Sequence, residues 1–124
     1  MAPGQARARW AVRVSVARRG GWRPWAAISG DFERALAAQA SRNVVTPHID
    51  AESRRGSDYV SVTMAMTVAA ADVAEALAHA WQAFRLAAAN DRRGWDMASA
   101  SAEVRPHEDG RSRSLRPTAG TRPG

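Results

Sequence analysis

The sequence contains no cysteine and no lysine. Without cysteine the chain cannot form disulfides, use thiolate chemistry, or hold zinc or iron–sulfur clusters through sulfur ligands. All 18 basic residues are arginine, and the chain also holds 28 alanines. A GC-rich genome imposes such a composition on any protein, so the net charge of +6 is weak evidence for a nucleic-acid partner.

Long apolar runs are also absent. No stretch approaches the roughly 20 residues that a transmembrane helix needs, and the first residues contain no apolar segment of the length of a secretory signal. We therefore expect a cytoplasmic protein with no membrane partner. With 124 residues, 45% of them hydrophobic, the chain is long enough for one domain around one core.

The arginines are distributed unevenly along the chain. Residues 1–25 carry six arginines and no acid, whereas residues 26–106 carry eight arginines and ten acids. We expect residues 1–8 to be a flexible N-terminus and residues 9–105 to be the folded domain. Residues 106–124 are rich in Arg, Pro and Gly, have almost nothing to bury, and are expected to form a disordered tail.

Alternating apolar and polar residues predict four strands. Residues 9–17 and 58–70 alternate most clearly, the second with the sequence DYVSVTMAMTVAA. Residues 43–52 form a weaker strand, and Pro47 predicts an edge position or a bulge there because proline cannot donate to a ladder. A last strand is expected over residues 95–104.

Two segments have helical periodicity. The first helix is expected over residues 31–42, although Pro24 could open it earlier and leave Gly30 inside. The second is expected over residues 72–90, where Asp72 and Glu75 are spaced as a capping pair. Its predicted apolar face consists of Val73, Leu77, Ala80, Trp81, Phe84 and Ala88.

The element order is strand, helix, strand, strand, helix, strand, which resembles the βαββαβ order of ferredoxin-like proteins. The resemblance covers element order over residues 9–105 and no sequence motif. It implies an α+β fold in which a four-stranded antiparallel sheet has two helices on one face.

The second face of that sheet, which we call the open face, is then left without a helix. The side chains at its centre are short and rich in hydroxyl groups. The face lacks the long charged side chains that normally solvate an exposed sheet. Such a face can pack against another sheet, so we predict a homodimer; a solvated face and a ligand-binding face are the alternatives. The interface candidates are Arg13, Ser15, Tyr59, Ser61, Thr63, Thr67, Trp95 and Met97.

A second candidate is the loop expected over residues 17–25, where arginines interleave with tryptophans. Guanidinium and indole groups can bind a protein partner or single-stranded nucleic acid. The structural alternative is that Trp25 packs beneath the first helix. The loop candidates are Arg18, Arg19, Trp22, Arg23 and Trp25.

Other constellations are weaker. His48, Asp50 and Glu52 would share one face of a regular strand, as ligands for a divalent metal do, but solvated residues of an edge strand need no such role, so we expect no metal or cofactor. An RNA-recognition motif has the same element order, yet the aromatic base-stacking platform it requires is missing here.

These observations favour a small interaction or regulatory module without catalysis. One alternative is a dimeric α+β-barrel-type protein that binds a small molecule, or a cofactor-independent enzyme, with its pocket between the second helix and the sheet. The other is an accessory protein that binds nucleic acid weakly and without sequence preference.

Overall fold

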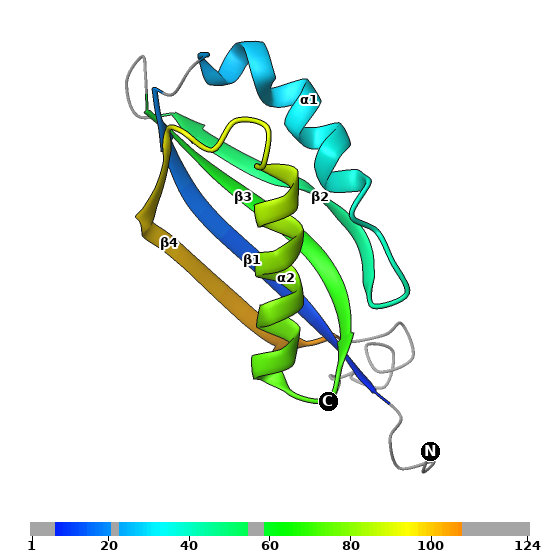
Figure 1. Cartoon of the computed structure of the whole chain (residues 1–124). Helices are drawn as coiled ribbons and strands as arrows, with labels where there is room; N and C mark the ends of the chain where they lie inside the picture. The colour runs from blue at the N-terminus through cyan, green and yellow to red at the C-terminus, as the bar shows by residue number, and fades with distance from the viewer. Residues whose placement is uncertain (1–6, 21–22, 55–58, 108–124) are drawn as a thin grey trace, which may run out of the picture.

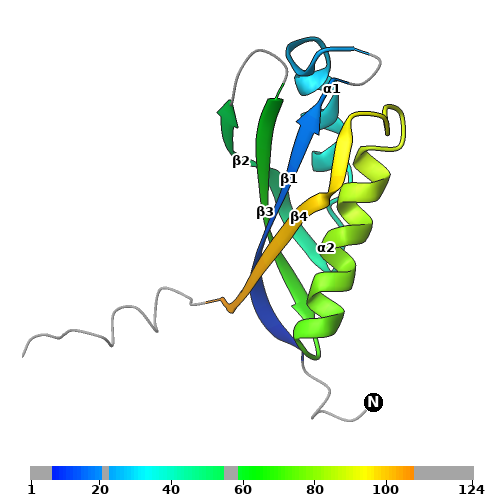
Figure 2. The same cartoon turned by 90° about the vertical axis from the view of Figure 1, so that its left-hand side faces the viewer.

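The computed structural model describes residues 7–20, 23–54 and 59–107. The four strands form one antiparallel sheet in the order β2-β3-β1-β4, and both helices lie on the same side of it (Figures 1 and 2). The expected α+β architecture is therefore confirmed, whereas the expectations for residues 1–6 and 108–124 lie outside the described residues. The elements are β1 (Ala8–Arg19), α1 (Trp25–Ala37), β2 (Val44–Arg54), β3 (Tyr59–Ala70), α2 (Val73–Ala87) and β4 (Trp95–Pro106).

The central strands β1 and β3 pair without interruption from Ala8 opposite Ala70 to Arg19 opposite Tyr59. Because side chains alternate between the faces of a strand, this register sends one row of each strand toward the helices and the other away from them. The row of β3 predicted to be inward is buried, and its partner row is half-exposed, as expected. The buried row is Val60, Val62, Met64, Met66, Val68 and Ala70.

Helix α1 begins six residues earlier than the expected start at residue 31, and it ends at Ala37 rather than at residue 42. Pro24 occupies the N-cap, so Gly30 lies inside the helix, which costs about 1 kcal/mol relative to alanine. Burial of a longer apolar stripe offsets that cost, because the additional turns place two more large side chains in the core. The buried stripe is Trp25, Ile28, Phe32 and Leu36.

Helix α2 has the predicted cap, since the Asp72 carboxylate accepts a hydrogen bond from the Glu75 backbone N–H at 2.8 Å. Its buried face is rotated from the predicted one: Val73 is 46% exposed, and Trp81 is only partly buried. Small side chains let the helix approach the sheet closely and leave the larger ones at its flank. The buried residues are Ala76, Ala80, Ala83, Phe84 and Ala87.

The two outer strands are irregular. β2 is an edge strand whose register shifts between Val45 and His48, which confirms the expectation for Pro47. β4 runs to Pro106, two residues past the predicted end, and its register with β1 shifts between Ser15 and Ala17. These irregularities decide which side chains reach the open face.

Aromatic rings join the two helices to one end of the sheet. Phe84 of α2 lies edge-on to Trp95 of β4 with 5.2 Å between ring centroids, and Trp25 of α1 lies edge-on to Trp95 at 5.6 Å. Phe32 contacts Trp25, Phe84 and Trp95, while Trp81 contacts Phe84 from the flank. Edge-to-face pairs of this kind add to the stabilisation from burial.

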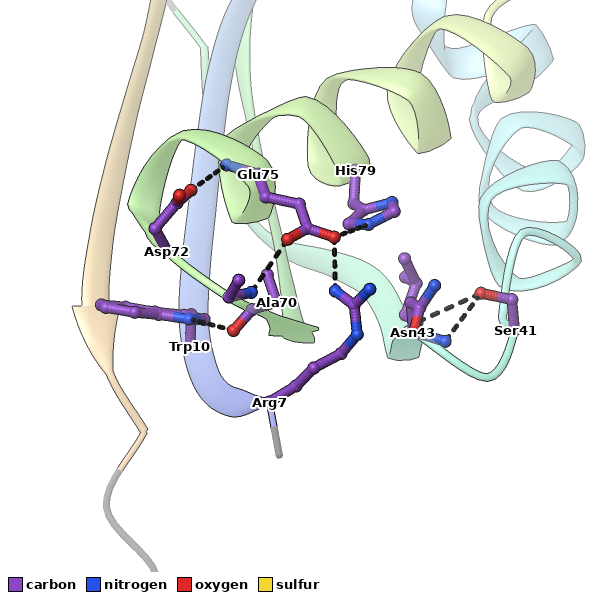
Figure 3. Close-up of polar contacts among 10 residues, drawn as sticks. Arg7, Trp10, Ser41, Asn43, Ala70, Asp72, Glu75 and His79 are labelled. Atoms are coloured by element: carbon purple, nitrogen blue, oxygen red, sulfur yellow. Dashed lines mark hydrogen bonds and ion pairs between the residues drawn. The ribbon is translucent and has the colours of Figure 1, made fainter. Parts of the chain in front are cut away.

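At the opposite end, a polar cluster ties the start of β1 to the start of α2 (Figure 3). The Glu75 carboxylate accepts hydrogen bonds from the Ala71 backbone N–H at 2.9 Å and from the Arg7 guanidinium. These contacts, the backbone bond above all, lower the pKa of Glu75 from 4.5 to about 2. His79 approaches the same carboxylate at 3.4 Å, and the Trp10 Nε1–H donates to the Ala70 carbonyl at 3.1 Å.

The lowered pKa of Glu75 predicts how stability responds to acid. A carboxylate with a lower pKa in the folded state stabilises the fold above its unfolded pKa, and that contribution is lost as the pH falls from 4.5 toward 2. Glu75→Gln should therefore lower the thermal unfolding midpoint at about pH 6 but leave it nearly equal to wild type near pH 2. Glu33→Gln, at an exposed glutamate of α1, controls for the loss of one carboxylate. An equal difference at both pH values would contradict this role.

Candidate functional site

Short hydroxyl side chains meet at the centre of the open face, on the two central strands. Ser15 pairs with Thr63 across β1 and β3, and their hydroxyl oxygens form a hydrogen bond of 2.8 Å. Ser15 also pairs with Ser101 of β4 on its other side. The hydrogen-bonding capacity of the Ser15 and Thr63 hydroxyls is therefore partly satisfied within the sheet rather than by water. By register, the open face comprises Arg9, Ala11, Arg13, Ser15, Ala17 and Arg19 of β1, Tyr59, Ser61, Thr63, Ala65, Thr67 and Ala69 of β3, Val45, His48, Ala51 and Ser53 of β2, and Ser101, Glu103 and Arg105 of β4.

Charged side chains are more numerous on this face than the sequence indicated. Arg13 reaches from β1 toward edge strand β2, where its Nη2 lies 2.8 Å from Oδ2 of Asp50. Glu103 and Arg105 of β4 form an ion pair beside it. The expectation of a face poor in long charged side chains is therefore wrong, although these charges are paired. A bulge in β2 next to Ile49 allows Asp50 to reach this face.

Trp95 and Met97, two of the predicted interface residues, do not extend the open face. Trp95 packs against Trp25 and Phe84 on the helix side of the sheet. Ser101 and Asp96 are five residues apart in β4, but their partners in β1, Ser15 and Ala17, are only two residues apart. The regular alternation of side chains between the two faces of β4, which the prediction assumed, is therefore interrupted here. Met97 lies in this irregular stretch and lines a hollow with Phe84 of α2.

Three of the five candidates in the predicted partner-binding loop, Arg18, Arg19 and Trp25, lie in regular elements rather than in a loop. Arg18 and Arg19 are the last residues of β1, and Arg18 is buried in the core. The guanidinium of Arg19 lies over the Tyr59 ring, 5.1 Å from its centroid. Trp25 is buried beneath α1, as the structural alternative proposed, and its Nε1–H donates to Glu52 at 3.1 Å. Arg23 is exposed, and Trp22 lies outside the described residues.

The His48, Asp50 and Glu52 constellation is split by the second irregularity of β2. His48 pairs with Ala65 on the open face, whereas Glu52 pairs with Val62 of the inward row. Within the described ranges, no group of three or more His, Asp or Glu side chains could hold a metal ion.

Many arginines have carboxylate partners, which weakens the case for a phosphate-binding surface. Such a surface requires arginines that are free to neutralise phosphates. The arginines that lie within salt-bridge distance of an Asp or Glu side chain are Arg7, Arg13, Arg18, Arg19, Arg34 and Arg105.

A hollow of about 260 Å³ lies on the helix side, beside the C-terminal half of α2. Phe84, Trp95 and Met97 provide apolar walls, and Arg85 and Arg92 provide charge. The two arginines were not among the sequence candidates, because one was placed on the outer helix face and the other in a turn. Their convergence depends on the path of the chain from α2 into β4.

Comparisons with protein-family models, with curated proteins and with solved structures find no match. Among the described residues, neither helix combines the length and the apolar character needed to cross a membrane.

Proposed function

We propose that this protein is a non-catalytic interaction module of ferredoxin-like fold that forms a homodimer by packing two open faces together. The sheet order β2-β3-β1-β4 supports the ferredoxin-like assignment. The observation that carries the dimer is the centre of the open face, where Ser15 of β1 and Thr63 of β3 lie side by side with their hydroxyls already hydrogen-bonded to each other. The cytoplasmic location expected from the sequence is part of this proposal.

The size of the open face suits such a dimer. Strands of 11 or 12 residues that rise about 3.3 Å per residue are roughly 40 Å long, and four of them at about 4.8 Å spacing span roughly 19 Å. The resulting area, about 750 Å², is close to the roughly 800 Å² that each partner buries in a stable interface of standard size.

The pairing of polar groups reduces the cost of covering this face. The Ser15 and Thr63 hydroxyls bond to each other, and the charge of Arg13 is compensated by Asp50. Groups that already have partners lose less on leaving water than unpaired ones. Val45, which is 44% exposed and shares this face with Thr67, adds apolar surface at the edge.

Thr63→Arg tests the proposal, because position 63 is central to the face and half-exposed in the single chain. Burying a long cation there without a partner should weaken dimerisation by roughly 3 kcal/mol or more, which raises the dimer Kd by at least a hundredfold. Light scattering should report about twice the 13.4 kDa chain mass for wild type and 13.4 kDa for Thr63→Arg.

Ala78→Arg is the matched control, since Ala78 is exposed on α2 away from the sheet. This variant should remain dimeric, and circular dichroism should show that both variants stay folded. A monomeric wild type, or a dimer that tolerates Thr63→Arg as well as Ala78→Arg, would refute assembly through the open face.

A second candidate function, binding of a small molecule, is favoured by the hollow beside α2. Its apolar walls and two arginines suit an amphiphilic anion with an apolar body. This is the region in which an α+β-barrel-type protein would bind its ligand, and the candidate implies no catalysis by itself.

The aromatic sulfonate dye ANS is a suitable probe of this hollow. We expect Met97→Glu to abolish ANS fluorescence enhancement, because it removes an apolar wall and adds a charge that repels the sulfonate. Leu86→Glu is the control, since Leu86 and Met97 are each 49% exposed but Leu86 does not line the hollow. No enhancement with wild type, or equal losses in both variants, would count against a binding hollow.

A further inference from the structure

The outer edge of β4 carries backbone groups that no strand among the described residues uses. β4 is the outermost strand on its side of the sheet. The His107 N–H donates to the Arg9 carbonyl at 2.9 Å, so these two residues form a hydrogen-bonded pair of the antiparallel ladder. Such pairs alternate with pairs whose N–H and C=O groups point away from the neighbouring strand. By that alternation, Ala102 and Val104 direct their N–H and C=O groups away from β1.

The two edges of the sheet differ in how well they are protected. β2 contains Pro47 and two register shifts, which are devices that keep further strands from pairing with an edge. β4 has one register shift near its start, but its ladder with β1 runs unbroken from Ser101 to Pro106. The charged residues of this regular part, Glu103 and Arg105, pair with each other on the open face. The regular part of β4 is therefore suited to pairing with a further extended chain.

The helix side of this edge is apolar and incompletely covered. Ala102 and Val104 pair with buried valines of β1, so their side chains belong to the helix-side row of β4. Ala102 is nevertheless exposed, and Val104 is only half-buried. Trp81, which is also partly buried, precedes Arg85 by one turn of α2 on the side that faces β4. Figure 2 shows α2 running alongside β4.

The hollow beside α2 lies at the start of β4, within reach of this edge. Val104 is opposite Val12 of β1. Asp96, next to the hollow, is opposite Ala17. The five residues of β1 between these positions, at about 3.3 Å each, span roughly 17 Å. An extended chain of about six residues therefore runs from the edge at Val104 to the hollow.

The hollow itself suits the end of a chain. Two exposed arginines, Arg85 and Arg92, border it, and none of the described residues that line it is acidic. Its volume of about 260 Å³ is below the roughly 300–1,000 Å³ of sites that bury drug-sized ligands. One apolar side chain next to one carboxylate matches both the size of the hollow and its charge.

We propose that the groove between β4 and α2 binds the C-terminal end of an extended partner peptide. The proposal deepens the second candidate function and rests on its claim that the hollow beside α2 binds an amphiphilic anion. The peptide pairs antiparallel with β4 through the backbone groups of Ala102 and Val104. Its last side chain enters the hollow, and its terminal carboxylate accepts hydrogen bonds from Arg85 and Arg92.

Charge complementarity decides the direction of the peptide. Because β4 begins at the hollow, an antiparallel partner ends there, and its negative carboxylate meets two arginines. A parallel partner would bring its positive amino end to the same arginines. In strand addition, backbone hydrogen bonds provide affinity and alternate side chains provide specificity. Alternate residues of the peptide should therefore be apolar, because they face the helix side beside Trp81.

A six-residue probe with this pattern is Ser-Val-Thr-Val-Thr-Leu, labelled with fluorescein at its amino end. Fluorescence anisotropy should show saturable binding of the free carboxylate form. The same peptide with an amidated end should bind about tenfold more weakly or worse, the scale of losing a hydrogen bond to a charged group. Equal binding of the two forms would overturn the assignment of a C-terminal end.

The ANS measurement separates failure of this inference from failure of the hollow. Absence of peptide binding together with ANS enhancement that Met97→Glu abolishes would overturn the peptide proposal and leave a small-molecule site. Absence of both signals would overturn the peptide proposal and the second candidate function together.

Arg92→Gln tests the role of the arginines, with Arg42→Gln as the matched control. Both arginines are exposed, but Arg42 does not line the hollow. Arg92→Gln should weaken binding of the carboxylate peptide about tenfold and change binding of the amidated peptide less than about twofold. Arg42→Gln should change neither. Equal effects of the two variants would show attraction by net charge alone and would overturn the site.

N-methylation of the probe tests strand addition without altering the protein. In an added strand, only one of two consecutive peptide N–H groups points toward β4. Two probes, each methylated at one of the two central residues, should therefore differ, with one binding about tenfold more weakly than the other. Equal affinities of the two methylated probes would overturn pairing with the β4 edge.

Discussion

The uninterrupted ladder between β1 and β3 is the constraint on which this structure depends. Its register runs through 12 residue pairs without a shift, so every side chain of both strands is assigned to a face. A slip by one residue would exchange the buried valines and methionines of β3 for its hydroxyl row. Because the hydrophobic effect opposes that exchange at every position, the inner and open faces are defined together.

The same register explains why a charge lies in the core. Since β1 continues to Arg19 in unbroken pairing with β3, Arg18 must take the inward position after Val16. The side chain cannot turn to water without breaking the ladder, so the turn after α2 supplies Asp91 and the tryptophan of β4 supplies its ring face. At the other end of β1, Arg7 meets the Glu75 carboxylate at the start of α2. Both ends of the central strand are thus linked to the helical layer by ion pairs.

The regular parts of this arrangement could be predicted from the sequence. Strict alternation identified both faces of β3, the Asp72–Glu75 spacing identified the start of α2, and Pro47 indicated an irregular edge strand. The failures have physical causes that periodicity does not encode. Extra residues in β4 reversed the placement of Trp95 and Met97, and a bulge in β2 separated Glu52 from His48 and Asp50. The start of α1 was predicted too late, because the free energy gained by burying Trp25 and Ile28 outweighs the cost of the low helix propensity of Gly30.

The candidate sites were less predictable than the fold, because they depend on contacts between distant segments. Arg13 was recognised as an open-face residue, but its pairing with Asp50 follows from the bulge in β2. Arg18 was assigned to a loop because the Gly pair and Pro24 that follow it interrupt the alternating pattern of the first strand. Nothing local in the sequence pairs Arg18 with Asp91, 73 residues away.

The central claim is that the open face is covered by a second copy of the chain, and the absence of native cysteine allows a direct measurement. A single thiol at Thr63→Cys is close in size to the native side chain, and its rate of modification by a thiol reagent can be followed as protein concentration rises. The account predicts that this rate falls with concentration, while the rate at an Ala78→Cys control stays constant. A rate at position 63 that does not depend on protein concentration would contradict it.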